Sequence, residues 1–375
     1  MICHPHLLAL LCATGQASGA PSATATGISR ALNPAISVNA LFLGRASNIA
    51  PDEVGQEEEG DDAHEHDAHD HAGPTRGLSL QEAEIRMTSA IDPYARADIV
   101  LAYSPGEGLA LEEGHATFDA LPGDMRARVG VLKPAFGKHA PQHVHNFLFA
   151  DAPWIIERSV GADVHGDAGL ELSWLAPLPH FAELTAQVTN GSEGTLFHSP
   201  DDEDLAYLGR LRNLWDLGEN GTLELSGSNL SGRNEHLGWT HLTGVDLTLQ
   251  WAPTRSVNRK KLIWQSELIR LSRQDTPAAD PRVDLSAYSA LSWKLSRRFW
   301  LQCRLDLIGL PSSDDGELRS AGAMQIAFVP SEFQSIRLFY GHRPAEGHEE
   351  STEASHEVRL QYSITIGSHP AHSYR

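Results

Sequence analysis

Apolar and polar residues alternate with a period of two along most of this chain. In the segment 82–88, Ile85 and Met87 share one face, and Glu84 and Arg86 share the other. A period of two is the signature of a β-strand with one apolar and one polar face, so the sequence predicts an all-β protein. The alternation recurs clearly at 94–103, 125–131 and 357–366.

About sixteen segments of roughly 9–14 residues follow this pattern, which is the length range of tilted strands in a membrane barrel. Period two alone fits two architectures: a water-soluble sandwich, whose apolar face points into a core, and a barrel, whose apolar face points at lipid. The expected strands lie near residues 35–44, 79–91, 93–103, 109–119, 124–133, 168–176, 180–190, 205–216, 221–230, 239–251, 260–272, 283–295, 298–309, 319–329, 333–342 and 355–366.

The connections between these segments alternate between short and long. Every second connection is a tight turn, such as 92–93 and 121–124, with 252–259 as the longer exception. The others include long stretches such as 45–78 and 134–167. Tight turns at one end and long loops at the other are typical of outer-membrane barrels. We therefore predict a single transmembrane, antiparallel, up-and-down β-barrel of about 16 strands, with no separate plug domain.

Composition agrees with an exported barrel. Hydrophobic residues make up 41% of the 375 residues, yet no run approaches the ~18–20 apolar residues that a membrane helix needs. Residues 1–20 have the features of a signal peptide, with an apolar run and small residues before a cut near Ala20; a buried N-terminal helix is the alternative. The barrel would then occupy residues 21–375. Of the three cysteines only Cys303 would remain, so we expect no internal disulfide.

The chain is strongly acidic, with 49 acidic and 29 basic residues and a formal charge of −20. Nucleic acid is itself a polyanion, so this balance argues against it as a partner. Much of the acidic charge gathers in three stretches that we assign to outer loops: 52–70, 201–204 and 346–357. We therefore expect outer-membrane lipid and small solutes as the partners.

Three motifs between residues 125 and 174 carry a family resemblance. They are Gly130-Val-Leu-Lys133-Pro-Ala-Phe136-Gly137, Trp154-Ile-Ile-Glu-Arg158-Ser159 and Gly169-Leu-Glu-Leu-Ser-Trp174. Their order resembles that of the phosphate-selective porin (O/P type) family and its outer-membrane relatives. The resemblance implies a porin-like channel of the bacterial outer membrane through which small solutes, anionic ones among them, pass passively. The resemblance is also compatible with assembly of the protein as a homotrimer.

Some relatives of this type are labelled zinc-regulated TonB-dependent outer-membrane receptors. An outer-membrane protein for zinc uptake or binding is therefore an alternative function, and a secreted metal-binding adhesin is another. A plugged transporter needs about 22 strands and a folded plug, whereas about 16 strands and their loops use up this chain. The sequence thus favours the porin over the receptor.

The segment 61–71 places His64, His66, His69 and His71 among five carboxylates. Imidazole and carboxylate together suit Zn, Cu or Ni. The alternative is a solvated acidic loop, because residues 52–70 hold ten acidic residues and no basic one. We expect no required cofactor, but loose binding of Zn or another divalent metal by these four histidines together with His348 in the last outer loop.

Basic residues surround the long loop 134–167, our candidate pore constriction. Lys133, Lys138 and Arg158 lie in or beside it, and basic residues on an inward-folded porin loop favour anions. The alternative is that basic side chains pair with carboxylates across strands. Four arginines on predicted lumen faces complete the expected pore-lining set: Arg86, Arg96, Arg126 and Arg128.

Enzyme signatures do not occur in the chain. It contains neither a Gly-x-Ser-x-Gly nucleophile elbow nor a His-Glu-x-x-His zinc motif. Many of its histidines fall in predicted loops without a nucleophile pattern nearby. We therefore expect a protein without catalytic activity, located in the outer membrane.

Overall fold

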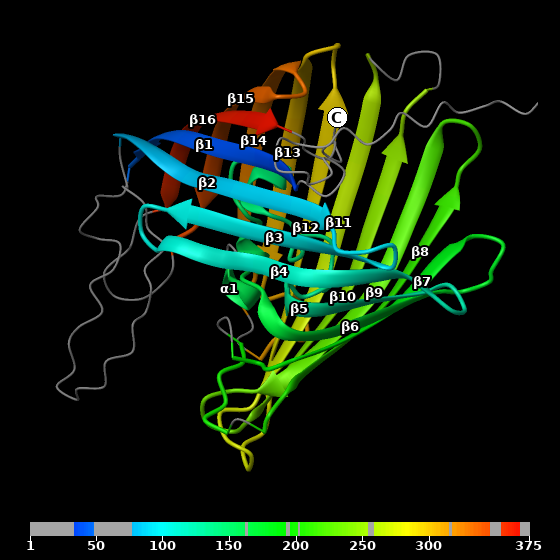
Figure 1. Ribbon diagram of the computed structural model, residues 1–375. Helices are drawn as coiled ribbons and strands as arrows, with labels where there is room; N and C mark the ends of the chain where they lie inside the picture. Colours follow the sequence, from blue (N-terminus) through cyan, green and yellow to red (C-terminus); the bar gives the residue numbers. More distant parts are fainter. Residues whose placement is uncertain are drawn as a thin grey trace, which may run out of the picture.

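The computed structural model describes residues 34–48, 77–161, 164–192, 196–201, 203–253, 259–314, 317–345 and 354–367. Within these ranges the chain forms sixteen strands, one short helix and one 3-10 turn (Figure 1). The helix is α1 (Trp154–Val160), and the 3-10 turn is η3 (Val144–Asn146). The strands are β1 (Ala35–Ser47), β2 (Gly77–Ala90), β3 (Ala95–Ser104), β4 (Gly108–Leu121), β5 (Met125–Leu132), β6 (Asp167–Leu175), β7 (Phe181–Thr189), β8 (Ala206–Asp216), β9 (Gly221–Arg233), β10 (Trp239–Trp251), β11 (Lys261–Arg273), β12 (Arg282–Lys294), β13 (Phe299–Ile308), β14 (Arg319–Ser331), β15 (Gln334–Arg343) and β16 (Ser355–Gly367).

The sheet closes on itself. Each strand pairs antiparallel with its neighbours in sequence, and β1 pairs with β16 in a register that runs from Ser37 opposite Gly367 to Ser47 opposite Glu357. A closed ladder leaves no open sheet edge, which is the condition for strands to cross lipid. The predicted antiparallel barrel of about 16 strands is confirmed, and the described residues hold no plug domain beside it.

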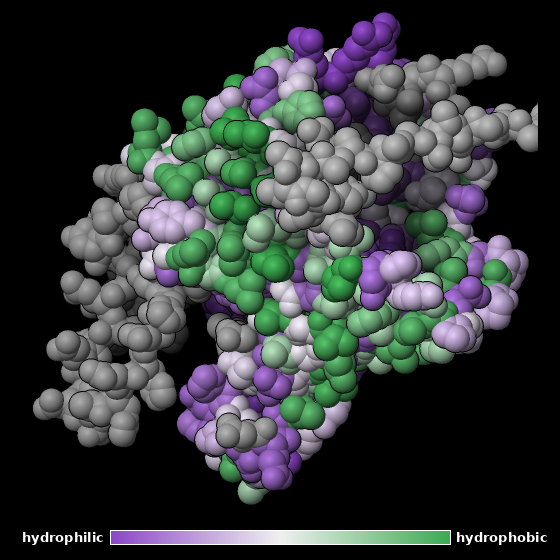
Figure 2. All heavy atoms as spheres, viewed as in Figure 1, coloured by the Kyte–Doolittle hydropathy of each residue, from purple (hydrophilic) through white to green (hydrophobic). Residues whose placement is uncertain are grey.

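The barrel is apolar outside and polar inside, as β6 illustrates. Leu170, Leu172 and Trp174 are 57%, 46% and 41% exposed, whereas Glu171 and Ser173 between them are 3% and 2% exposed. A water-soluble sandwich would bury the leucines and expose the glutamate. Hydrophobic side chains accordingly cover the strands on the visible outer surface, and hydrophilic ones gather at the loops (Figure 2). This inverted pattern is that of a lipid-facing barrel wall.

Local turn chemistry explains where strands end. Between β2 and β3, the Asp92 carboxylate accepts hydrogen bonds from the backbone N–H groups of Tyr94 and Ala95 at 2.8 and 2.9 Å. Between β4 and β5, Gly123 and Asp124 adopt positive φ angles of 77° and 58°, which suit these residue types in a tight turn. The first strand extends to Ser47, three residues beyond the predicted end, because residues 45–47 still pair with β16.

The long connection 133–166 contains the one helix among the described residues. No helix among the described residues is long and apolar enough to cross a membrane. The predicted signal peptide, 1–20, lies outside the described residues, as does most of the predicted first outer loop, 45–78.

Candidate functional site: the inward loop and an acidic histidine cluster

The connection 133–166, the inward loop, folds into the barrel. Near its start it binds the wall formed by β7 to β9. The backbone N–H of Ala135 donates to Gln187 Oε1 at 2.8 Å, and that of Gly137 donates to Ser228 Oγ at 3.1 Å. Both acceptors point into the lumen from strands that follow the loop in the chain, so the loop is held to the wall from its first residues.

Later residues of the loop bind the opposite wall. The Ala150 N–H donates to Gln325 Oε1 on β14 at 2.8 Å, and the Trp154 N–H donates to Asp306 on β13 at 3.0 Å. The loop starts after β5, and β13 is eight strands away in a ring of sixteen. The loop therefore spans the whole lumen, as expected for the candidate constriction.

Buried ion pairs hold this far end in place. Arg304 on β13 donates to both carboxylate oxygens of Asp151 at 2.9 Å, and its Nε donates to Asp306 at 2.7 Å. Burial alone would raise the pKa of the Asp151 carboxyl, but the Arg304 charge and hydrogen bonds outweigh it and lower that pKa. A partly exposed pair between Arg343 on β15 and Glu157 of α1 at 2.6 Å adds to these contacts.

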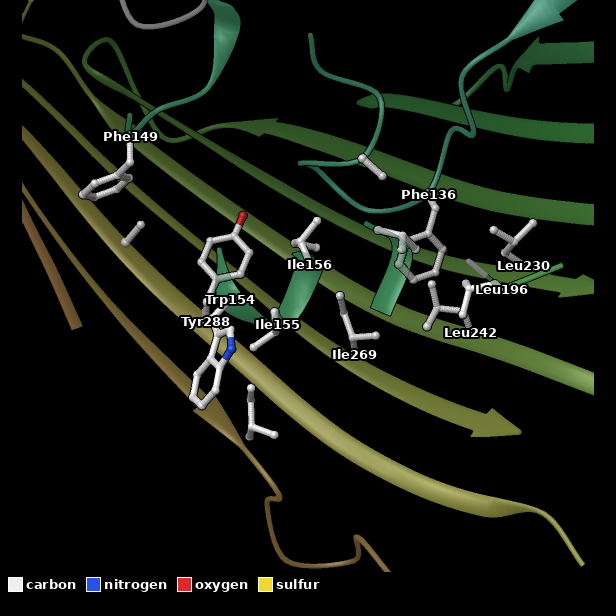
Figure 3. Packing of buried hydrophobic residues seen from close by; sticks show 14 of the residues in the cluster. Phe136, Phe149, Trp154, Ile155, Ile156, Leu196, Leu230, Leu242, Ile269 and Tyr288 are labelled. Carbon is white, nitrogen blue, oxygen red and sulfur yellow. The ribbon is translucent and has the colours of Figure 1, made fainter. Parts of the chain in front are cut away.

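An apolar cluster fills part of the lumen beneath the loop. Phe136 lies over Leu242 of β10, while Trp154 and Ile155 of α1 lie near Tyr288 and Ile269 (Figure 3). The strand pattern alone predicts a wet, charged lumen. The inward face of β8 to β11 is partly apolar instead, because the loop brings large apolar side chains that need apolar partners.

The inward loop also contacts β2 and β4, through side chains that can gain or lose a proton. At η3, two loop histidines meet four carboxylates on the inward faces of β2 and β4. Each of these six residues is at most 8% exposed. We call this group the acidic histidine cluster: Glu82, Glu84, Glu112, Glu113, His143 and His145.

His143 lies between three of the carboxylates. Its Nδ1 is 2.5 Å from Glu112 Oε2 and its Nε2 is 3.1 Å from Glu113 Oε2. Glu84 Oε2 lies 3.3 Å from His143 Nδ1 and 3.0 Å from His145 Nδ1. Nitrogen and oxygen atoms of three segments far apart in the sequence thus converge on one small volume.

The cluster attracts positive charge. Burial and the nearby Lys133 ammonium lower the pKa of His143, but hydrogen bonds to Glu112 and Glu113 and the Glu84 charge outweigh them and raise it to about 9. Lys133 Nζ itself lies 3.4 Å from Glu112 Oε2. In the absence of another cation, a proton on His143 therefore compensates part of the acidic charge at neutral pH.

The predicted lumen arginines form a ladder along β2 to β5, each paired with a carboxylate. Arg86 and Arg96 pair with Asp98 at 3.0 and 3.1 Å. Arg128 pairs with Glu171, and Arg126 lies 3.6 Å from Glu183. Each of these arginines therefore lies in an ion pair, and the expectation that they line the pore stays a prediction.

The basic residues of the loop lie in three different environments. Lys133 is 2% exposed beside the acidic histidine cluster. Lys138 is partly buried and pairs with Glu224 of β9 at 2.8 Å. Arg158 is exposed on α1, with its guanidinium 5.8 Å from the centre of the Trp154 ring. The structure therefore does not bring these three cations together.

The predicted metal ligands His64, His66, His69, His71 and His348 all lie outside the described residues. The acidic histidine cluster was not among the predicted sites. Its signal in the sequence is the His143-Val-His145 triplet inside a long loop, together with the Glu112-Glu113 pair on a predicted strand. Only the fold of the loop shows that these segments meet.

Comparison with known proteins agrees with this architecture. A scan against protein-family models finds no match. An uncharacterised protein of Aquifex aeolicus is 27% identical over 339 residues, covering 80% of this chain and 70% of the relative.

Several solved structures of bacterial outer-membrane proteins are similar to this chain in fold. OprB of Pseudomonas putida is 10% identical with a TM-score of 0.59, covering 89% of this chain and 94% of OprB. DcaP, an outer-membrane channel of Acinetobacter baumannii, is 10% identical with a TM-score of 0.52, covering 92% and 100%. OmpT of Vibrio cholerae is 7% identical with a TM-score of 0.55, covering 90% and 99%. The chain therefore has the 16-stranded barrel fold of outer-membrane porins and channels.

Proposed function

We propose that this protein is a porin-like channel of the bacterial outer membrane for the passive passage of small solutes. The observation that carries the proposal is a closed barrel, apolar outside and charged inside, whose inward loop spans the lumen and is bound to both walls. An inward loop narrows a porin and places its selecting groups where solutes pass. A catalytic role has no such support from the described residues.

Within this class, we propose a mild preference for anions. In the arginine ladder, the arginines face solvent more than the buried carboxylates Asp98 and Glu171 do, although Arg96 also pairs with Asp119, which is 54% exposed. The side chains of Arg96 and Arg126 are 43% and 38% exposed, whereas those of Asp98 and Glu171 are 2% and 1% exposed. Arg212 on β8 repeats the arrangement at 37% exposed. A solute on this side of the lumen therefore meets exposed guanidinium groups in front of the buried carboxylates Asp98, Glu171 and Glu224, although the chain as a whole is acidic.

Reversal potentials across a planar bilayer test the preference. We expect the refolded wild type to favour chloride over potassium under a salt gradient. The double variant Arg96→Gln/Arg126→Gln should shift the reversal potential towards potassium, because it leaves the buried carboxylates without their exposed partners. Arg282→Gln is a matched control, since this 74% exposed side chain lies at the loop end of β12. An unshifted potential in the double variant contradicts the anion proposal, and a protein without ion conductance contradicts the channel.

Finer features of this function remain predictions. They are the membership in the phosphate-selective group, the weak metal binding by the His-rich segment, and a role for Lys133 and Arg158 in selecting anions. The Vibrio cholerae OmpT barrel is described in a trimer form, and we propose a homotrimer here by analogy. Cross-linking of the detergent-extracted protein tests that assembly.

A further inference from the structure

The acidic histidine cluster buries four carboxylates close to two imidazoles. Lys133 Nζ lies 3.4 Å from Glu112 Oε2, and the imidazoles of His143 and His145 lie beside Glu112 and Glu84. Burying carboxylates is costly unless cations join them. Several carboxylates and imidazoles around one small buried volume are an environment that a divalent cation suits.

The spacing of the donor atoms is that of a metal site. Zinc–nitrogen and zinc–oxygen bonds of about 2.0–2.2 Å in a tetrahedron separate the donor atoms by roughly 3.3–3.6 Å. Glu84 Oε2 lies 3.3 Å from His143 Nδ1 and 3.0 Å from His145 Nδ1. Glu112 Oε2 lies 2.5 Å from His143 Nδ1, so insertion of a metal would need this one pair to separate slightly.

Two further observations point to a ligand rather than to a closed hydrogen-bond network. Glu112 is 1% exposed, and its Oε1 has no hydrogen-bond donor among the described residues. The Nε2 of His143 faces Glu113 at 3.1 Å, on the opposite side of the ring from the convergent Nδ1. A carboxylate behind an imidazole in this way fixes its orientation and makes its other nitrogen a better metal ligand.

We propose that Glu84, Glu112 and His143, whose donor atoms lie within 4.8 Å of one another, bind one divalent first-row transition metal, with Zn²⁺ as the reference ion. His145, whose Nδ1 lies 3.0 Å from Glu84 Oε2, completes the donor set after a small shift. Two imidazoles with two carboxylates are a donor set for zinc and its neighbours rather than for Ca²⁺ or Mg²⁺, which prefer oxygen donors alone. Glu113 orients His143, and Glu82 lies within reach of His145 and Glu84.

A metal at this position would fasten the inward loop to a third sector of the wall. His143 and His145 flank or belong to η3, whereas Glu84 and Glu112 belong to β2 and β4. Hydrogen bonds and ion pairs already hold the loop to β7–β9 and to β13–β15. The inference concerns how the loop is held and does not depend on which solute passes, or on whether any does.

Zinc titration of the refolded full chain tests the site. The His-rich segment is a competing ligand, so the background variant carries His64→Ser, His66→Ser, His69→Ser and His71→Ser. We expect this background to bind one Zn²⁺ per chain by calorimetry. We also expect Co²⁺ to give the intense visible absorption of a tetrahedral site, and Zn²⁺ to raise the thermal unfolding midpoint.

Ligand variants on this background should weaken Zn²⁺ binding at least about tenfold. Glu112→Gln and His145→Asn are the main variants. Heat-modifiable gel migration shows whether each variant forms a folded barrel. If one of the two does not fold, Glu84→Gln takes its place. His165→Asn is the matched control, because His165 lies in the same loop but faces Glu107 at 3.7 Å. A background that binds no Zn²⁺, or folded ligand variants that bind as tightly as the control, overturns the proposal.

Discussion

At the scale of single residues, burial decides which protonation state the inward loop tolerates. His139 is 5% exposed, its ring packs against Phe147 with centroids 4.2 Å apart, and its Nε2 has no hydrogen-bond partner among the described residues. Burial first, and the Arg304 charge second, lower the pKa of His139 to about 3. The folded protein therefore holds this imidazole neutral at every pH above about 3.

This pKa predicts a loss of stability in mild acid. The unfolded chain takes up a proton at His139 below about pH 6.5, whereas the folded chain does not, so acid favours unfolding. We expect His139 to reduce the free energy of unfolding by about 2 kcal/mol between about pH 8 and pH 5. Urea unfolding in detergent, compared between wild type and His139→Gln, isolates this residue. The variant should lose less stability over that interval, and equal losses would show that His139 is not held neutral.

At the scale of elements, the strands were predictable and the path of the inward loop was not. Alternation fixes a strand wherever one face meets lipid and the other meets the lumen, which is why β10 begins and ends at the predicted residues Trp239 and Trp251. The loop has no such local periodicity. Its path depends on partners as distant as Gln325, 175 positions from Ala150, and hence the acidic histidine cluster could not be assembled from sequence spacing.

One glycine on β10 allows the loop to enter the lumen at this depth. Gly244 lies at an inward position, and a Cβ atom built there would come within 2.7 Å of the Phe136 ring. The ring occupies the space that a side chain at this position would take. Without the loop, a larger residue would fit at this inward position of the strand. The glycine is therefore needed for its contact with the loop and not for the strand itself.

Substitution of this glycine should displace the loop without breaking the strand. We expect Gly244→Leu to lower the free energy of unfolding by about 1–3 kcal/mol through overpacking and to make the loop accessible to added protease. The matched control is Gly209→Leu on β8, because Gly209 is exposed and a Cβ there meets nothing within 4 Å. That control should stay within about 0.5 kcal/mol of the wild type. Equal losses of stability and equal protease sensitivity in the two variants would show that the position of the Phe136 ring does not require a glycine at residue 244.

At the scale of the whole molecule, the barrel and the inward loop are separable structures. All sixteen strands complete the hydrogen-bonded ring among themselves, and no residue of the loop belongs to that ring. The loop is joined to the inside of the ring by side chains, through Asp151 and Arg304 on one side and Gln187 and Ser228 on the other. The barrel should therefore form without the loop, whereas the loop has no fold without the barrel.

Replacing residues 139–159 by a short Gly-Ser linker tests this separation and the channel together. The variant should still show heat-modifiable migration, because the strand ladder is intact. Its single-channel conductance should rise severalfold, because the segment that spans the lumen is gone. Its unfolding midpoint should fall, since inward apolar side chains such as Tyr288 and Ile269 lose the cover of Trp154 and Ile155. Shortening the 274–281 connection is the control and should leave conductance unchanged, because these residues connect β11 to β12 outside the inward loop. A loop-replaced barrel that folds but conducts like the wild type would show that the inward loop is not the constriction.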